Sequence, residues 1–175
     1  MIISLSEIMN TRDKVENINA PIEMDTFDLQ SNSYKFSKKD YAKLVITNLG
    51  NRKVMIEAKA NISLILNCSR CLKDLEYPID IHFVKEIDFN LTGEDRARDL
   101  DETNYIQGYD LNVDTLIYEE ILIRFPMKLL CSEECKGICK KCGQNLNDGS
   151  CSCDTTEYDP RMERIRDIFN NFKEV

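Results

Sequence analysis

Alternating apolar and polar residues form the clearest pattern in this chain, and the alternation covers residues 41–67. In the segment YAKLVITNLGNRKVMIEAKANISLILN, Leu44 and Ile46 fall on one face of a strand, and NLGN is suited to a hairpin turn. The same two-residue period continues to Leu66 and returns in YPIDIHFVKEIDF. A period of two is typical of strands with one buried face. The pattern therefore predicts an antiparallel meander, with the CSRC sequence at 68–71 in one of its turns.

A helical period follows in NVDTLIYEEILIRF and predicts a helix over approximately Val113–Phe125. Asn112 or Asp114 can cap its first turn, and Pro126 marks its end. The helix presents a stripe of apolar side chains that we expect to pack on the sheet: Val113, Leu116, Ile117 and Ile121, widened by Leu122 and Phe125. Glu119 and Glu120 are expected on its exposed face, and no acid or base partner lies near them in the sequence to form a catalytic pair.

The other segments carry weaker signals. Residues 1–40 are mixed, and residues 86–120 hold eleven acidic residues against two basic ones. Within that acidic stretch, residues 91–108 are predicted as a solvated loop, or alternatively as a docking surface for a basic partner. Asp159-Pro160 predicts the start of a terminal helix that packs on the body or docks on a partner. Its apolar residues follow helical spacing: Met162, Ile165, Ile168, Phe169 and Phe172.

These elements predict an α+β fold built on an antiparallel sheet with one packed helix. We expect two domains. The first is a sheet domain over residues 1–126 that includes the helix 113–125. The second is a cysteine-rich zinc module with the terminal helix over residues 127–175.

Composition narrows the class of protein. A chain of 175 residues with 42% hydrophobic and 31% charged residues is ordinary for a globular protein and does not need disulfides to fold. No apolar run approaches the ~18 residues of a membrane span, and the start lacks the pattern of a signal peptide. We therefore expect a cytoplasmic protein without membrane partners, in a compartment where cysteine clusters indicate metal or catalysis. The net charge of −8 argues against non-specific binding of nucleic acid through overall charge.

The candidate chemistry lies in eight cysteines, which form four close pairs: Cys68/Cys71, Cys131/Cys135, Cys139/Cys142 and Cys151/Cys153. Structural zinc takes four thiolate or imidazole ligands, and two such pairs supply one set. Gly143 directly follows the third pair, where a residue free to adopt positive φ relieves the turn. The spacing predicts two Zn²⁺ ions bound through cysteines only. The negative charge of such sites is offset by nearby cations: Arg70, Lys136, Lys140 and Lys141.

Four pairs can combine into two sites in three ways. We favour a local site from 139/142 with 151/153, which leaves 68/71 and 131/135 for a second ion. Other chemistries fit less well. The C-x3-C-x2-C spacing of radical S-adenosylmethionine enzymes lacks its α/β barrel, no spacing matches a ferredoxin run, and CSRC does not open a helix as a thioredoxin motif would. The single histidine, His82, lies in a strand pattern and is expected to be structural. We predict no catalytic residues, no enzyme activity and no small-molecule substrate.

Taken together, these motifs resemble the YceD family of large ribosomal RNA subunit accumulation proteins. The resemblance covers residues 40–172 and rests on CSRCL, the capped helix ending at Pro126, LCSEECKGICKKCGQNLN, CSC, and DPR opening the terminal helix. Lys140 departs from the pattern, because the family usually has proline there. Some family members lack the last two cysteine pairs but keep the first two, which supports grouping 68/71 with 131/135.

The resemblance implies a non-enzymatic bacterial, cytosolic factor, also found in plastids, that supports 23S ribosomal RNA accumulation and large-subunit biogenesis. Residues 124–142 carry a local charge of +3, and five basic residues there are candidate RNA contacts: Arg124, Lys128, Lys136, Lys140 and Lys141. The expected partners are ribosomal RNA or a precursor large-subunit particle, and a basic ribosomal protein for the acidic stretch 86–120. The alternative function is a redox-switched zinc chaperone, because similar cysteine pairs occur in such proteins.

Overall fold

A computed structural model describes residues 1–91, 104–153, 165 and 168 of the chain. The chain forms two compact units. The first unit consists of Met1–Asn67 and Asp74–Leu129, and the second of Cys68–Lys73 and the chain from Leu130 onward. Of the predicted terminal helix, only Ile165 and Ile168 belong to the described residues, and both are helical and exposed.

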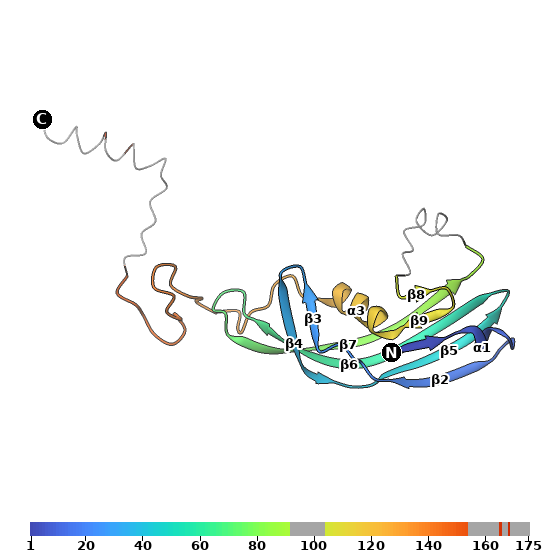
Figure 1. The fold of residues 1–175 in the computed structure, drawn as a ribbon. Coiled ribbons are helices and arrows are strands. Elements are labelled where there is room, and N and C mark those ends of the chain that lie inside the picture. Colours follow the sequence, from blue (N-terminus) through green and yellow to red (C-terminus); the bar gives the residue numbers. More distant parts are fainter. Residues whose placement is uncertain (92–103, 154–164, 166–167, 169–175) are drawn as a thin grey trace, which may run out of the picture. The chain divides into compact units, whose positions relative to one another are not determined.

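Six antiparallel strands form the larger sheet of the first unit (Figure 1): β2 (Val15–Ala20), β3 (Thr26–Leu29), β4 (Asn32–Lys39), β5 (Ala42–Gly50), β6 (Lys53–Asn67) and β7 (Asp74–Asp88). β6 lies at the centre. β7 pairs with the full length of one edge of β6, while β5 and then β4 pair with successive parts of the other edge. β2 extends the sheet beyond β5, and β3 extends it beyond β4. The predicted α+β class is therefore confirmed.

The predicted meander is the central part of this sheet, because β5, β6 and β7 are consecutive and antiparallel. Asn51 and Arg52 both have positive φ, at 48° and 58°, as the two central residues of a type I′ hairpin turn require. Gly50, at φ 78°, lies beside a register shift that begins at Asn48. The CSRC sequence occupies the loop between β6 and β7, where the alternation placed it.

Alternate residues of β6 point into the core, and none is more than 4% exposed: Val54, Ile56, Ala58, Ala60, Ile62, Leu64 and Leu66. Their partners on β7 include Ile79, Ile81 and Ile87, which are equally buried. Burial of this face supplies the main stabilisation of the sheet, at roughly 25 cal/mol per Å² of apolar surface. His82 lies on the opposite face of β7 with its side chain 60% exposed, 3.5 Å from Glu57 Oε1.

The first forty residues contain elements that the sequence did not predict individually. Besides β2, β3 and β4, these are β1 (Ile2–Ser4) and the short helix α1 (Ser6–Met9). A second sheet joins β1 to β9 (Asp110–Asn112) and β8 (Ile106–Gln107). The expectation of a loop over residues 91–108 is wrong for its last part, since β8 occupies Ile106–Gln107 and Tyr105 is only 3% exposed. Residues 92–103 of that stretch lie outside the described residues.

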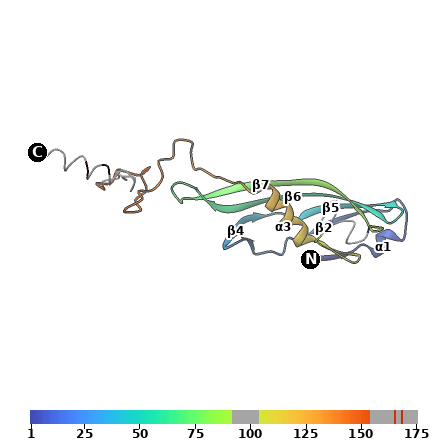
Figure 2. The ribbon, with the colours of Figure 1, turned by 90° about the horizontal axis from the view of Figure 1, so that it is seen from above.

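Helix α3 (Val113–Arg124) lies against the concave face of the curled larger sheet (Figures 1 and 2). Asn112 caps it as predicted, because its Oδ1 accepts the N–H of Thr115 at 3.2 Å. The stripe of Val113, Leu116, Ile117 and Ile121 is fully buried. Leu122 does not widen the stripe, since it is 43% exposed. No helix in the described ranges is long and apolar enough to cross a membrane.

Glu120 corrects the prediction that both glutamates of α3 face solvent. Its side chain is 4% exposed and forms ion pairs with Lys85 Nζ at 2.8 Å and with Arg124 one turn along the helix. Burial alone would raise the pKa of this carboxyl, but the two cations outweigh burial and lower it below its ordinary value. Glu120 is therefore a buried structural carboxylate, because β7 places Lys85 on the core face of the sheet.

Candidate metal centre

All eight cysteines lie within the described residues, and all are free thiols. They gather into two groups in the second unit, each with its four sulfur atoms within 4.8 Å of one another. We call them site A (Cys68, Cys71, Cys131 and Cys135) and site B (Cys139, Cys142, Cys151 and Cys153). Of the three possible combinations of pairs, the structure forms the one that was favoured from the sequence.

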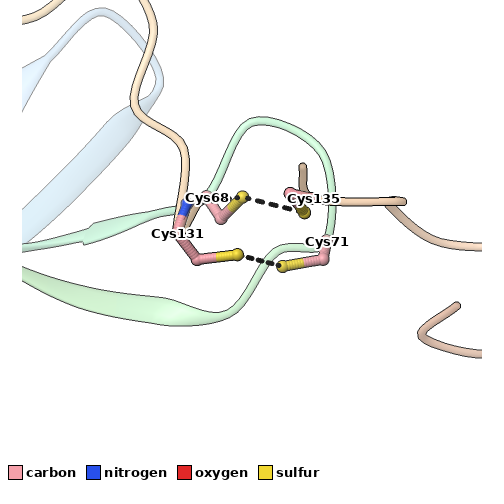
Figure 3. A group of neighbouring side chains, drawn as sticks. All are labelled: Cys68, Cys71, Cys131 and Cys135. Atoms are coloured by element: carbon pink, nitrogen blue, oxygen red, sulfur yellow. Dashed lines mark hydrogen bonds between the residues drawn. The ribbon is translucent and has the colours of Figure 1, made fainter. Parts of the chain in front are cut away.

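The sulfur spacing in site A fits a tetrahedral ion. Figure 3 shows the four side chains converging, with Cys68 Sγ 3.8 Å from Cys135 Sγ and Cys71 Sγ 3.6 Å from Cys131 Sγ. A regular tetrahedron of thiolates at a Zn–S distance of about 2.3 Å separates its sulfurs by about 3.8 Å. Cys68, Cys71 and Cys135 are buried, and Cys131 is exposed. Both groups place four sulfur atoms close enough together that they could hold a metal ion.

The two C-x2-C pairs have the same backbone geometry. In site A, the N–H of Cys68 donates to the carbonyl of Lys73 at 2.8 Å, and the N–H of Leu72 donates to the carbonyl of Cys68 at 3.0 Å. In site B, the corresponding bonds join Cys139 to Gln144 at 2.8 Å and Gly143 to Cys139 at 2.8 Å. Two segments with different residues around their cysteines, 68–73 and 139–144, thus form the same turn, in which both sulfur atoms face one point. We call this turn a knuckle.

Each knuckle requires a residue with positive φ directly after its second cysteine. Gly143 takes φ 74°, as its glycine predicts, whereas Leu72 takes φ 59° despite its side chain. This role of Leu72 was not predicted from the sequence, because leucine carries no signal of left-handed backbone. Only its position after a C-x2-C pair could have revealed it.

The thiols of each site ionise unequally. Backbone N–H groups of Cys71, Arg70 and Cys131 lower the pKa of the Cys68 thiol to about 6 against the effect of burial. In site B, the N–H groups of Cys142 and Lys141 lower the pKa of Cys139 to about 6. These N–H groups favour the thiolate, the form that binds a metal.

Other thiols in each site shift in the opposite direction, and the largest increases are at Cys131 and Cys153. Side-chain hydrogen bonds with Cys135 and, to a smaller extent, with Cys71 raise the pKa of the Cys131 thiol to about 12. A side-chain hydrogen bond with Cys142 and, to a smaller extent, burial raise the pKa of the Cys153 thiol to about 12. Four neighbouring thiols cannot all lose their protons unless a cation compensates the charge, and a divalent ion supplies that compensation.

Arg70 has a larger role than the predicted charge balance. Its Nη1 donates to the carbonyl of Cys135 at 2.9 Å and to the carbonyl of Glu133 at 3.2 Å. These bonds hold the 131–135 segment beside the first knuckle. Asn147, whose role the sequence did not predict, donates from Nδ2 to Cys135 Sγ at 3.4 Å.

The five candidate RNA contacts have different surroundings. Lys136, Lys140 and Lys141 are exposed in the second unit, and Lys128 is exposed in the first. The guanidinium of Arg124 pairs with Glu120, and its Nη2 donates to the carbonyl of His82 at 3.0 Å. Arg124 is thus bound within its own unit.

Comparison with known proteins agrees with the cysteine pattern. Residues 56–169 match the model of the family described as large ribosomal RNA subunit accumulation protein YceD. The chain is 25% identical over 122 residues to the uncharacterized protein YlbN of Bacillus subtilis (strain 168), across 69% of each chain. No solved structure matches. Because the family model covers most of the chain, including both cysteine groups, this protein belongs to the YceD family.

Proposed function

We propose that this protein is a non-enzymatic cytoplasmic factor that supports 23S ribosomal RNA accumulation and large-subunit biogenesis, with two structural Zn²⁺ ions. The family description supports the link to the large ribosomal RNA. The observation that carries the proposal is the pair of four-cysteine groups. Four thiols from the chain fill the coordination of each ion, as in structural zinc sites, whereas catalytic zinc keeps one position for water.

The RNA contact is proposed at the second knuckle. Lys136, Lys140 and Lys141 are exposed there, and the glutamates nearest in sequence, Glu133 and Glu134, leave this segment with a net positive charge. Neither Lys140 nor Lys141 is a metal ligand candidate, so these lysines can contact phosphate while the cysteines hold the ion. The lysines thus provide a local basic surface on an acidic chain.

A basic ribosomal protein is the proposed partner of the acidic stretch 86–120. Several acids there already have partners inside the first unit. Glu86 and Asp88 pair with Lys53, Asp114 pairs with the N-terminal amino group, and Glu120 pairs with Lys85 and Arg124. The proposal therefore rests on the acidic balance of the stretch as a whole, eleven acidic residues against two basic ones, and not on these four side chains.

The RNA contact is tested by reversing two charges. Lys140→Glu/Lys141→Glu should weaken association with single-stranded RNA and lower the salt slope of log K by about 1.4, at about 0.7 per lost phosphate contact. Zinc content should not change. The matched control is Lys35→Glu/Lys38→Glu, which alters net charge equally in β4 of the first unit. An unchanged slope in the first variant, or an equal fall in the control, would exclude the second knuckle as the contact.

The cellular role is tested by sedimenting a lysate on a gradient and locating the protein. Co-migration with precursor large-subunit particles supports the proposed function. Free protein that suppresses aggregation only after oxidation would favour the redox-switched chaperone instead. The specific observation behind that alternative is that Cys131 and Cys142 are exposed, so that oxidants can reach one thiol in each site.

A further inference from the structure

The two cysteine groups are joined by a three-residue segment. Cys135 belongs to site A and Cys139 to site B, with only Lys136, Gly137 and Ile138 between them. Such a short connection brings the backbone of one site into contact with the other. Any ordering of this segment by a metal at one site therefore acts on a ligand of the other site.

The connecting segment is bonded to the first knuckle. The N–H of Ile138 donates to the carbonyl of Arg70 at 3.1 Å, and Arg70 lies between two ligands of site A. Gly137 takes φ 82°, and a Cβ there would lie 3.1 Å from the same carbonyl oxygen. Only glycine allows both the backbone conformation and this close approach.

Asn147 bonds to the same segment from the side of site B. It lies in the loop between the site B ligands Cys142 and Cys151. Its Oδ1 accepts the N–H of Lys136 at 2.8 Å, and its Nδ2 donates to the site A sulfur of Cys135 at 3.4 Å. The N–H of the preceding residue, Leu146, donates to the carbonyl of Gly137 at 2.8 Å. A residue held in a loop of site B thus contacts a metal ligand of site A.

We propose that sites A and B load metal cooperatively, and that Asn147 is the positioning residue that couples them. A metal at site B closes the loop that carries Asn147 and fixes its amide beside Cys135. The conformational entropy of ordering this loop is then lost once, at the first binding event, and not again at the second. Coupling of this kind is reciprocal, so a metal at site A must favour site B by the same factor. The inference rests on the metal-binding part of the proposed function and not on its RNA part.

The coupling is measured by removing one site at a time. Zn²⁺ affinity under reducing conditions is determined by competition with a chromophoric chelator, in the wild type and in Cys139→Ser/Cys142→Ser. Loss of site B should weaken site A by about 5–150-fold, the usual range of coupling between sites. The reciprocal variant, Cys68→Ser/Cys71→Ser, should weaken site B by the same factor.

Native mass spectrometry of the wild type at one equivalent of Zn²⁺ gives a second measure. Cooperative loading predicts that chains with none or two ions dominate over chains with one. Two ions bound with independent affinities would overturn the coupling and leave the metal proposal standing. A wild-type chain that binds no metal would overturn both.

Asn147→Asp separates the amide donor from the shape of the loop. Aspartate keeps an acceptor for the N–H of Lys136 but loses the donor to Cys135 Sγ. Loss of such an outer hydrogen bond typically lowers metal affinity by about 10–100-fold, and we expect this at site A. With Co²⁺ as the probe, the thiolate charge-transfer band of site A should move to longer wavelength, because a thiolate without its donor is oxidised more easily.

The same substitution in the Cys68→Ser/Cys71→Ser background should leave the affinity of site B unchanged. The matched control is Gln144→Ala, which removes an exposed amide from the same loop; wild-type affinities and band positions are expected. Asn147→Asp with wild-type affinity and spectrum at site A would overturn the role of Asn147. In the Cys68→Ser/Cys71→Ser background, a loss of site B affinity as large as the loss at site A would show that Asn147 only maintains the loop, and would overturn its coupling role as well.

Discussion

The buried carboxylate of Glu120 allows a sharp test of the first unit. Substitution to Gln keeps the size of the side chain but removes the charge that Lys85 and Arg124 compensate. Glu120 is 4% exposed, and its partners are 26% and 29% exposed. The stabilisation from these ion pairs should therefore be intermediate. Disrupting a wholly buried ion pair costs about 3–5 kcal/mol, whereas an exposed ion pair contributes about 0–1 kcal/mol. We expect Glu120→Gln to lower the free energy of unfolding by about 2 kcal/mol near neutral pH.

The pH dependence of this loss follows from the direction of the pKa shift. The pKa of Glu120 is lower in the folded protein than its ordinary value of 4.5, because Lys85 and Arg124 outweigh burial. The folded state thus favours the ionised form. The stabilisation is present above the ordinary pKa and is lost as pH falls through the lower folded value. The difference between wild type and Glu120→Gln should narrow below about pH 4.5 and nearly vanish below the folded pKa.

The assay is urea denaturation followed by the circular dichroism of the sheet, at several pH values and in both proteins. Glu86→Gln serves as the control, since Glu86 pairs with Lys53 at 3.0 Å while its own side chain is 53% exposed. Its effect should be far smaller at every pH. A Glu120→Gln variant as stable as wild type at neutral pH, or a deficit that does not change on acidification, would refute this assignment of the buried ion pair.

Three further substitutions test the packing of the first unit and the frame of site A. Phe27→Ala should cost about 3–5 kcal/mol in urea denaturation, because Phe27 is fully buried among three aromatic rings. Gly137→Ala should lower the Zn²⁺ affinity of site A about tenfold, because backbone strain of about 1.4 kcal/mol corresponds to a tenfold change in affinity. Gly149→Ala is the control and should leave the affinity unchanged, since the new Cβ would lie 3.7 Å from its nearest neighbour. Arg70→Lys should weaken site A in the same chelator competition although the charge is kept; unchanged affinity would show that charge alone matters.

The period of two residues predicted the centre of the fold because β5 and β6 bury one face along nearly their whole length, and β7 buries or partly buries one face. The strands of the first forty residues could not be predicted in this way, for a physical reason. β4 is mostly exposed, β1 has only three residues, and β2 carries polar residues such as Asn17 and Asn19. Their place is set by pairing with strands distant in sequence, which no local pattern records. The burial of Glu120 was missed for a related reason, since it depends on Lys85 facing inward from β7.

The candidate site shows the same division between local and distant information. Cysteine spacing identified the four close pairs and favoured the grouping that the structure forms, because a C-x2-C turn is a local structure. The roles of Arg70 and Asn147 arise from bonds between distant segments, and spacing does not reveal them. Arg70 reaches two carbonyls of the 131–135 segment with one guanidinium nitrogen. A planar group with five fixed donors suits this task better than an ammonium, so arginine there positions a ligand segment rather than only balancing charge. The cysteines alone thus predict two candidate metal sites, whereas the hydrogen bonds that hold their segments together come from Arg70 and Asn147.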